Sequence, residues 1–381
     1  MKPKIIFFIT EDWYFWSHRL PIARAARNAG FEVFIATRVN QLKTLIDKEG
    51  FNLIPIGLKR RSKNIVKELF SIVEIVKIYR RVRPDIVHHV TVKPVLYGSW
   101  AARITGINGV VNALAGLGSI FVAQGWKANV LRQLVVYAYR SAFSAKTTIA
   151  IFQNPEDLKL FVDAGVVKSD KTVLIRGSGV DTSRFIHLPE PAGIPTVILA
   201  SRMLWDKGIG ELVDAARQLL KDGVNCRIVL VGSPDPENPT SISEETLGNW
   251  HAEGIVEWWG HKEDMPEVFA KSNIVVLPSY REGLPKGLLE AASCGRAIVA
   301  TDVPGCREIV RHNENGLLVP PHDSKSLANA LKFLIENSEL RAKMGARGRE
   351  IVEAEFSEEI VVRQTLELYN KLLEIAQFHS Q

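Results

Sequence analysis

Short apolar runs alternate with longer amphipathic stretches along most of the chain. In the first half, the apolar runs have the length and β-branched content of buried strands, which predicts strands at Lys4–Thr10, Glu32–Thr37, Leu53–Ile56, Asp85–His89, Gly109–Ala113 and Thr147–Phe152. The stretches between them space their apolar residues as helices do, at about 18–29, 40–49, 63–82, 93–105, 127–143 and 155–164. Strands that alternate with helices are typical of a parallel sheet covered by helices on both faces.

The alternation begins again after a passage rich in proline and glycine, residues 177–193. The strands predicted beyond it are Thr196–Ala200, Arg227–Val231, Ile255–Trp259, Ile274–Leu277, Ala297–Thr301 and Leu317–Val319, and the chain is helical from Ser324 to Ala376. A chain of 381 residues is also longer than one hydrophobic core usually supports. We therefore predict an α/β protein with two doubly wound, Rossmann-like domains that face a cleft. Their bounds are 1–176 and 194–357, with a linker at 177–193 and a C-terminal helix at 358–381.

The composition is that of a globular protein, because 46% of the residues are hydrophobic. No apolar run reaches the roughly 18 residues that a membrane-spanning helix needs, and Lys4–Thr10 is too short for the apolar part of a secretion signal. Cys226, Cys294 and Cys306 show neither a CxxC spacing nor a metal-ligand spacing. We expect them to be buried free thiols in a reducing cytoplasm.

Positive charge is concentrated in the first half of the chain. Residues 1–190 contain 28 Lys and Arg against 14 Asp and Glu, a net charge of +14, whereas residues 191–381 contain 20 against 28, a net charge of −8. The excess is densest in a predicted amphipathic helix and the segment before it, at Lys59, Arg60, Arg61, Lys63, Lys67, Lys77, Arg80, Arg81 and Arg83. This pattern predicts peripheral binding to an anionic membrane surface, the inner face of the cytoplasmic membrane. We expect no nucleic-acid partner, because no helix-turn-helix, zinc or RNP-like pattern accompanies the charge.

Two carboxylates, Glu282 and Glu290, flank a predicted turn from a strand into a helix. Pro285 has the fixed φ and the missing N–H that suit the start of that helix. The amides of its first turn, those of Lys286 and Gly287 foremost, then offer a diphosphate site with the positive end of the helix dipole behind it. Glu290 lies about one and a half turns inside the helix, in reach of a diol such as a ribose. Glu282 lies where the group beyond the phosphates would sit.

Two cations, Arg202 and Lys207, follow the strand at Thr196–Ala200 on a loop that enters a helix. Ligands of doubly wound sheets bind at the carboxyl ends of the strands. Fixed cations at that edge can neutralise a leaving diphosphate, which is electrostatic stabilisation of the charge that develops in the reaction. The two segments together predict a nucleotide-diphosphate site in the second domain.

These segments resemble retaining glycosyltransferase family 4, whose members have the GT-B fold. Residues 279–295, with Glu282-Gly283 and Leu288-Leu289-Glu290-Ala291, are similar to its Glu-x7-Glu motif. Arg202-x4-Lys207-Gly208 is similar to its Gly-Arg-x4-Lys-Gly signature, with Ser201 in place of the first glycine. The resemblance implies that Gly260-His261 hold the nucleotide base, that Glu282, Gly283 and the backbone of Leu284 hold the donor sugar, and that the C-terminal helix crosses back to the first domain.

The first domain resembles one branch of this family more narrowly. Arg19-Leu20-Pro21-Ile22, residues 115–121 and residues 124–129 are similar to bacterial enzymes that add an N-acetylhexosamine, notably N-acetylgalactosamine in α-1,3 linkage, to an undecaprenyl-diphosphate-linked sugar. Two positions depart from the family: its glycine-rich loop after the first strand is Glu11–His18 here, and Ala115 replaces its histidine after the fifth strand. The candidate acceptor-side residues are therefore His18, Arg19, Asn112 and Gly116, with His88, His89, Thr91 and Lys93 as further replacements.

The resemblance implies transfer of a sugar from a UDP-sugar to a polyprenyl-diphosphate-linked sugar with retention, and Arg202, Lys207 and Glu282 as the catalytic residues. We expect no metal and no other cofactor, because the two cations and the helix dipole already supply positive charge and the chain has no Asp-x-Asp. Three alternatives stay open: an isomerase similar to UDP-N-acetylglucosamine 2-epimerase, a non-catalytic subunit that binds sugar nucleotides, and a nucleic-acid-binding protein. Transfer of a labelled sugar to a lipid-linked acceptor separates them.

Overall fold

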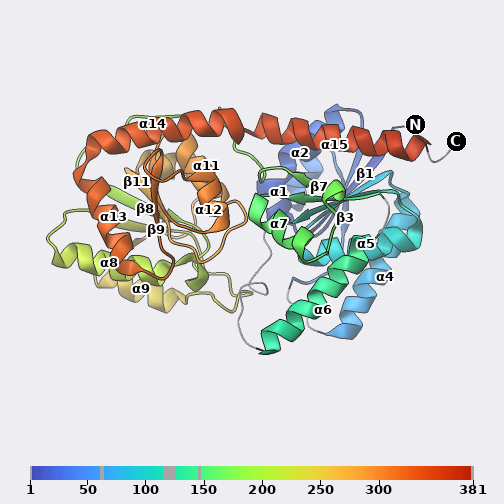
Figure 1. Ribbon diagram of the computed structural model, residues 1–381, viewed down its shortest axis with the longest axis horizontal. Coiled ribbons are helices and arrows are strands. Elements are labelled where there is room, and N and C mark those ends of the chain that lie inside the picture. Colours follow the sequence, from blue (N-terminus) through green and yellow to red (C-terminus); the bar gives the residue numbers. More distant parts are fainter. Residues whose placement is uncertain (1, 61–63, 115–125, 145–146, 379–381) are drawn as a thin grey trace. The chain divides into compact units, whose positions relative to one another are not determined.

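The computed structural model describes residues 2–60, 64–114, 126–144 and 147–378, which form two compact units (Figure 1). The first unit comprises Met1–Ser178 together with Val361–Gln381, and the second comprises Gly179–Ile360. In each unit a parallel sheet is packed between helices, so that the backbone polar groups of the strands are satisfied inside the sheet while apolar side chains fill both faces.

The described part of the first unit contains a seven-stranded sheet with the order β3-β2-β1-β4-β5-β6-β7, in which all neighbouring pairs are parallel. Its strands are β1 (Lys4–Glu11), β2 (Glu32–Arg38), β3 (Asn52–Pro55), β4 (Ile86–Val90), β5 (Gly109–Leu114), β6 (Thr148–Phe152) and β7 (Thr172–Leu174). Its helices are α1 (Asp12–His18), α2 (Leu20–Asn28), α3 (Lys43–Lys48), α4 (Ile65–Val82), α5 (Val92–Thr105), α6 (Trp126–Ala142), α7 (Pro155–Asp163) and most of α15 (Glu358–Phe378).

The second unit contains a six-stranded parallel sheet, over the same described residues, with the order β10-β9-β8-β11-β12-β13. Its strands are β8 (Thr196–Ala200), β9 (Arg227–Val231), β10 (Glu257–Trp258), β11 (Ile274–Leu277), β12 (Ala297–Thr301) and β13 (Gly316–Val319). Its helices are α8 (Ile209–Lys221), α9 (Glu244–Ala252), α10 (Met265–Ala270), α11 (Lys286–Ser293), α12 (Pro304–Ile309), α13 (Ser324–Glu336) and α14 (Ser338–Glu355), with a 3₁₀ turn at Trp205–Lys207.

The two doubly wound sheets predicted from the alternating pattern are confirmed. Each predicted strand lies within two residues of an observed one, because strands buried on both faces, such as β5 and β12, give unbroken apolar runs. The edge strand β7 was not predicted, since its three residues are only half-buried and give no such run.

Residues 12–18 were predicted as a loop and form helix α1 instead. Phe15 is buried in the core of the first unit beside Leu20 and Ile22. The buried carboxylate of Asp12 accepts from the backbone amide of Asn40 at 2.6 Å. The helix therefore depends on contacts with segments distant in the sequence, which local spacing does not contain.

The passage predicted as a linker, residues 177–193, divides between the units, since the boundary falls between Ser178 and Gly179. Residues beyond Gly179 are packed within the second unit. Arg341 NH2 lies 2.9 Å from Glu190 Oε2, and Arg349 NH2 donates to the carbonyl of Thr182 at 3.0 Å. Proline and glycine in this passage therefore mark turns on the surface of a folded unit.

The C-terminal segment from Val361 is grouped with the first unit. Tyr369 of α15 is fully buried, and its hydroxyl lies 2.5 Å from Nδ1 of His88 in β4. The Tyr369 ring also packs against Phe7 and Phe31, with ring centroids 6.5 and 6.0 Å away. This part of α15 thus closes the face of the first sheet that α1 and α2 also cover.

The structure bears on two expectations from the composition, the one about membrane-spanning helices and the one about the cysteines. Within the described ranges, no helix is both long and apolar enough to cross a membrane. The three cysteines are free thiols: Cys294 and Cys306 are buried, and Cys226 is half-buried.

Candidate active site

The strands β8 and β11 are neighbours in the second sheet, although β9 and β10 lie between them in the sequence. The order of the strands therefore reverses here, and doubly wound sheets bind ligands at the carboxyl ends of strands at such a point. The loops that leave these two ends are residues 201–208 and 278–285. They carry three of the residues predicted from the sequence, Arg202, Lys207 and Glu282.

The two loops are packed directly against each other. Gly208 has a φ of +70°, and a Cβ on it would lie 2.0 Å from the carbonyl oxygen of Pro278, so that only glycine fits. Near this contact the amide of Tyr280 donates to the carbonyl of Asp206 at 3.0 Å. The two loops therefore form one continuous surface at this edge of the sheet.

Lys207 and Glu282 form an ion pair across these loops. Lys207 Nζ lies 2.5 Å from Glu282 Oε1, and both side chains are mostly buried. An ammonium group has three N–H donors, so one contact with Glu282 leaves Lys207 further donors for a ligand. The structure thus joins a cation and a carboxylate that lie 75 residues apart in the sequence.

Arg202 is held by an acid that sequence reasoning missed. Its NH1 lies 2.7 Å from Oδ2 of Asp235, and the Arg202 side chain is 45% exposed, against 13% for Asp235. Asp235 follows the carboxyl end of β9. An acid at that position was a signal available in the sequence, because the carboxyl ends of neighbouring parallel strands meet at one edge of the sheet.

Helix α11 begins at Lys286, with Pro285 as its N-cap residue, one residue later than predicted. The first amides of a helix have no acceptor within it, so the start of α11 presents donors beside the Glu282 loop. One turn inside, Glu290 Oε1 lies 3.8 Å from Lys286 Nζ. Burial raises the pKa of the Glu290 carboxyl, whereas the nearby Lys286 and Arg184 act to lower this pKa.

The remaining donor-side candidates lie on the same edge of the second sheet. Gly260 follows β10, and its carbonyl accepts from the amide of Gly232 at 2.8 Å. His261 is exposed. The side chain of Leu284 is buried in the core, so only its backbone belongs to the surface of the loop. Gly283 continues the loop that carries Glu282. Their contacts with a nucleotide or a sugar stay predictions.

His18 and Arg19 lie at the junction of α1 and α2 in the first unit. The His18 ring stacks on Tyr14 with centroids 4.2 Å apart, and its Nδ1 lies 2.7 Å from Oγ of Ser17. Arg19 is buried, and its NH1 donates to the carbonyl of His18 at 3.0 Å. The junction lies near the strands β1 and β4, where the order of the first sheet reverses.

Asn112 is not brought together with His18 and Arg19. It lies on the face of the sheet covered by α4 and α5, where its Oδ1 accepts from Nδ1 of His89 at 2.7 Å and its Nδ2 donates to Oγ of Ser99 at 2.9 Å. Burial lowers the pKa of His89 to about 4, so this histidine is neutral at pH 7. Asn112 and His89 form a buried network that joins β4 and β5 to α5.

The other candidates on the acceptor side have structural partners or lie outside the described residues. His88 contacts Tyr369, and Lys93 Nζ lies 2.9 Å from Glu68 Oε1. Thr91 has a φ of +75° at the start of α5. Gly116, Arg61 and Lys63 lie outside the described residues.

Comparison with known proteins assigns the class. Residues 182–351 match the family described as glycosyl transferases group 1, and residues 4–154 match the family described as glycosyl transferase 4-like. The chain belongs to these glycosyltransferases and is an enzyme of that class. The family resemblance seen in the sequence is thereby confirmed.

Two relatives align over nearly the whole chain. The N,N'-diacetylbacillosaminyl-diphospho-undecaprenol alpha-1,3-N-acetylgalactosaminyltransferase of Campylobacter jejuni is 28% identical over 93% of this chain and 95% of the relative. The putative glycosyltransferase EpsD of Bacillus subtilis is 29% identical over 98% of each chain.

Solved structures show the same fold. Sucrose-phosphate synthase from Thermosynechococcus elongatus has a TM-score of 0.80 at 20% identity and covers 98% of this chain and 100% of its own. Anabaena HepE in complex with UDP and glucose has a TM-score of 0.76 at 20% identity and covers 97% of this chain and 99% of its own. The GT-B class expected from the sequence is confirmed.

Proposed function

We propose that this glycosyltransferase moves an N-acetylhexosamine, N-acetylgalactosamine or N-acetylglucosamine, from a UDP-sugar to a polyprenyl-diphosphate-linked sugar in polysaccharide or glycan biosynthesis. The observation that carries the proposal is the grouping of Arg202, Lys207 and Glu282 at the edge where the second sheet reverses its strand order. The names of the Campylobacter relative and the UDP-bound Anabaena structure support the acceptor and the nucleotide.

The donor residues have separate roles in this proposal. Arg202, Lys207 and the first amides of α11 receive the diphosphate, where fixed donors stabilise the charge that develops on it. Glu290 accepts from the ribose hydroxyls. Glu282 and the backbone of Leu284 hold hydroxyls of the sugar, and the ion pair with Lys207 keeps the Glu282 carboxylate oriented beside the phosphates.

Transfer proceeds with retention in this proposal. The bond between the anomeric carbon and the diphosphate oxygen breaks, and the acceptor hydroxyl oxygen bonds to the same face of that carbon. The hydroxyl proton passes to the departing diphosphate, which leaves as UDP. Among the described residues there is no group of three His, Cys, Asp or Glu placed to hold a metal ion, and we propose that the cations and the start of α11 take the part that a metal plays in other transferases.

Incubation of the purified protein with radiolabelled UDP-sugars and extracted polyprenyl-diphosphate glycans tests this proposal. We expect label to move from one UDP-N-acetylhexosamine to the lipid fraction, in the same anomeric configuration as in the donor, and we expect the rate to survive EDTA. Release or epimerisation of the sugar without an acceptor would favour the isomerase instead. Loss of transfer in EDTA that Mn²⁺ restores would contradict the metal-free assignment.

We also propose that α4 lies on an anionic membrane surface, where a polyprenyl-linked acceptor would be found. Val66, Leu69, Phe70 and Val73 are between 43% and 69% exposed. Their spacing places them on one face of the helix. An exposed apolar face beside cations is typical of helices that lie in a membrane interface.

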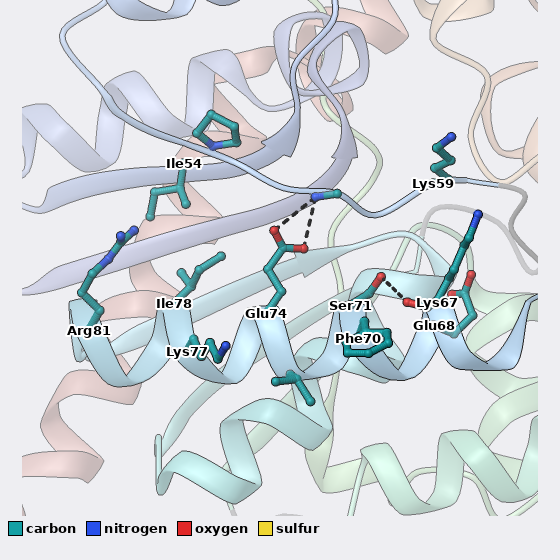
Figure 2. Close-up of a pocket in the computed structure, with 13 residues that line it drawn as sticks. Ile54, Lys59, Lys67, Glu68, Phe70, Ser71, Glu74, Lys77, Ile78 and Arg81 are labelled. Carbon is teal, nitrogen blue, oxygen red and sulfur yellow. Dashed lines mark hydrogen bonds between the residues drawn. The ribbon is translucent and has the colours of Figure 1, made fainter.

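Cations outnumber acids on α4, and the two acids, Glu68 and Glu74, have partners within the first unit. Glu74 accepts from the amide of Gly57 at 3.1 Å, and Glu68 accepts from the hydroxyl of Tyr97 at 2.5 Å and from Lys93. Figure 2 shows Glu74 turned toward the segment above the helix. The groove between this segment and α4, of about 660 Å³, is lined by four cations: Lys59, Lys67, Lys77 and Arg81.

Replacing Lys67 and Lys77 by serine is expected to weaken binding to phosphatidylglycerol vesicles by about 2 kcal/mol, roughly 30-fold, since each cation near an anionic surface contributes about 1 kcal/mol. High salt should release the wild type, because the attraction decays over a Debye length. Co-sedimentation with phosphatidylglycerol and with phosphatidylcholine vesicles measures both effects. Replacing Lys221 and Lys343 of the second unit, both exposed, is the matched control. Equal binding of wild type to both lipids would contradict the proposal.

A further inference from the structure

The segment Ser233–Ile242, which follows β9, contacts the loop of Arg202 and Lys207 near both of its own ends. The amide of Met203 donates to the carbonyl of Ser233 at 3.0 Å, and the carbonyl of Met203 accepts from the amide of Ile242 at 2.9 Å. Between them the amide of Trp205 donates to the carbonyl of Thr240 at 2.7 Å. These backbone bonds hold Met203, the bridge residue Leu204 and the start of the 3₁₀ turn at Trp205 against the segment.

Side chains of the same segment reach both ends of the cation loop. Asp235 Oδ2 lies 2.7 Å from NH1 of Arg202. At the other end, Thr240 Oγ1 donates to Oδ2 of Asp206 at 3.2 Å, and Asp206 directly precedes Lys207. The segment therefore contacts the residues that set the position of each cation.

The backbone of Asp235 is itself fixed. The amide of Asp235 donates to Oγ of Ser241 at 2.9 Å, and its carbonyl accepts from the amide of Asn238 at 2.6 Å. Asn238 Oδ1 in turn accepts from the amide and the hydroxyl of Thr240 at 3.2 and 3.1 Å. A turn closed by its own side chains presents Asp235 to Arg202 at a defined place.

We infer that Asp235 is a positioning residue for the donor diphosphate and acts through Arg202. This inference rests on the proposed function. A guanidinium group has five N–H donors in a planar fork, and Asp235 contacts that of Arg202 at Nη1. The Arg202 side chain stays 45% exposed, so a diphosphate that arrives from solvent can reach it.

A carboxylate beside a phosphate-binding cation has two opposing effects. It lowers the local positive potential, which weakens attraction of an anion, and it removes rotamer freedom from a long side chain, which favours binding. Ordering one such side chain costs about 0.5–1.5 kcal/mol on binding, whereas an exposed ion pair contributes little by its charge alone. Because Arg202 is half-exposed and Asp235 is fixed, the ordering effect dominates.

Isothermal titration of UDP into the wild type and into Asp235→Ala tests the inference. We expect the Asp235→Ala substitution to weaken UDP binding roughly fivefold to tenfold and to raise KM for the UDP-sugar more than it lowers kcat. Asp235→Glu should recover part of the affinity. Asp214→Ala removes one of the two acidic partners of another half-exposed arginine, Arg217, at 3.0 Å in the same unit, and should leave UDP binding unchanged.

The double variant with Arg202→Ala separates positioning from a general structural effect. If Asp235 acts through Arg202, the Asp235→Ala substitution causes no further loss of UDP binding once Arg202 is absent. Additive losses, or unchanged or tighter binding by Asp235→Ala alone, would overturn the inference. A wild type that does not bind UDP would instead refute the proposed function, so the two failures are distinguishable.

Discussion

Alanine at Lys207 or at Glu282 is expected to lower kcat/KM for the UDP-sugar by roughly 100-fold or more. Lys207 is fixed beside the site of the leaving diphosphate by its 2.5 Å contact with Glu282. The loss of one fixed electrostatic contact to a developing charge typically costs about 3 kcal/mol of transition-state stabilisation. In the proposed function, Glu282→Ala removes both a group that holds the donor sugar and the group that orients Lys207, so its effect should be at least as large.

Steady-state kinetics at several donor concentrations measures this prediction, with circular dichroism to verify folding. Both side chains are mostly buried, and removal of one leaves the other charge unpaired, so the circular dichroism spectrum decides whether a loss of activity reflects the site or the fold. Lys271→Ala is the matched control, because Lys271 pairs with Glu267 at 2.6 Å and precedes β11, which places it at the opposite end of that strand from the loop of Glu282. Turnover at the wild-type rate by folded Glu282→Ala would remove the central assignment.

Alanine at Gly232 is expected to lower the free energy of unfolding of the second unit by about 3 kcal/mol or more. Gly232 has a φ of +140°, and a Cβ on it would lie 1.8 Å from the carbonyl oxygen of Ser201. A backbone conformation that side chains rarely adopt costs about 1–3 kcal/mol by itself, and forced overlap in a packed site typically adds about 1–3 kcal/mol. The substitution also pushes the segment that carries Arg202.

Urea unfolding followed by tryptophan fluorescence gives the change in stability. Gly248→Ala is the control, because Gly248 lies in α9 with no atom within 4 Å of its added Cβ. Alanine there is expected to stabilise the helix by about 0.5–1 kcal/mol. A Gly232→Ala protein as stable as the wild type would show that the contact between Gly232 and Ser201 relaxes freely.

The sequence predicts the sheets well because each strand has its own local apolar pattern. Ile274–Leu277 and Ala297–Thr301 are continuous apolar runs, and the observed strands have the same bounds. The places of Arg202 and Lys207 could be predicted for a related reason: both lie on the loop that follows a strand, at the edge of the sheet where the carboxyl ends of the strands lie. In both cases the local sequence specifies where along the chain the strand or the loop residue occurs.

Partners across loops could not be predicted in the same way. Asp235 meets Arg202 from 33 residues away; its place after β9 puts an acid at the same edge of the sheet, but neither segment specifies which side chain meets which. Asn112 presents the opposite case. It was a candidate for the acceptor side because the chain departs from the family's pattern there, but its side chain turns into the core to meet His89 and Ser99. Which face a central strand residue occupies depends on the helices packed against it, because both faces are buried.

The place of Tyr369 and Leu372 in the core of the first unit has a consequence for synthesis on the ribosome. Residues 1–178 supply the sheet of that unit, but part of the helix layer over Phe7 and Phe31 is encoded at the other end of the chain. The second unit, residues 179–360, is complete before that layer is made. The first unit is therefore the first to be synthesised and the last to complete its helix layer. Until the final helix emerges, its uncovered apolar face is a target for chaperones.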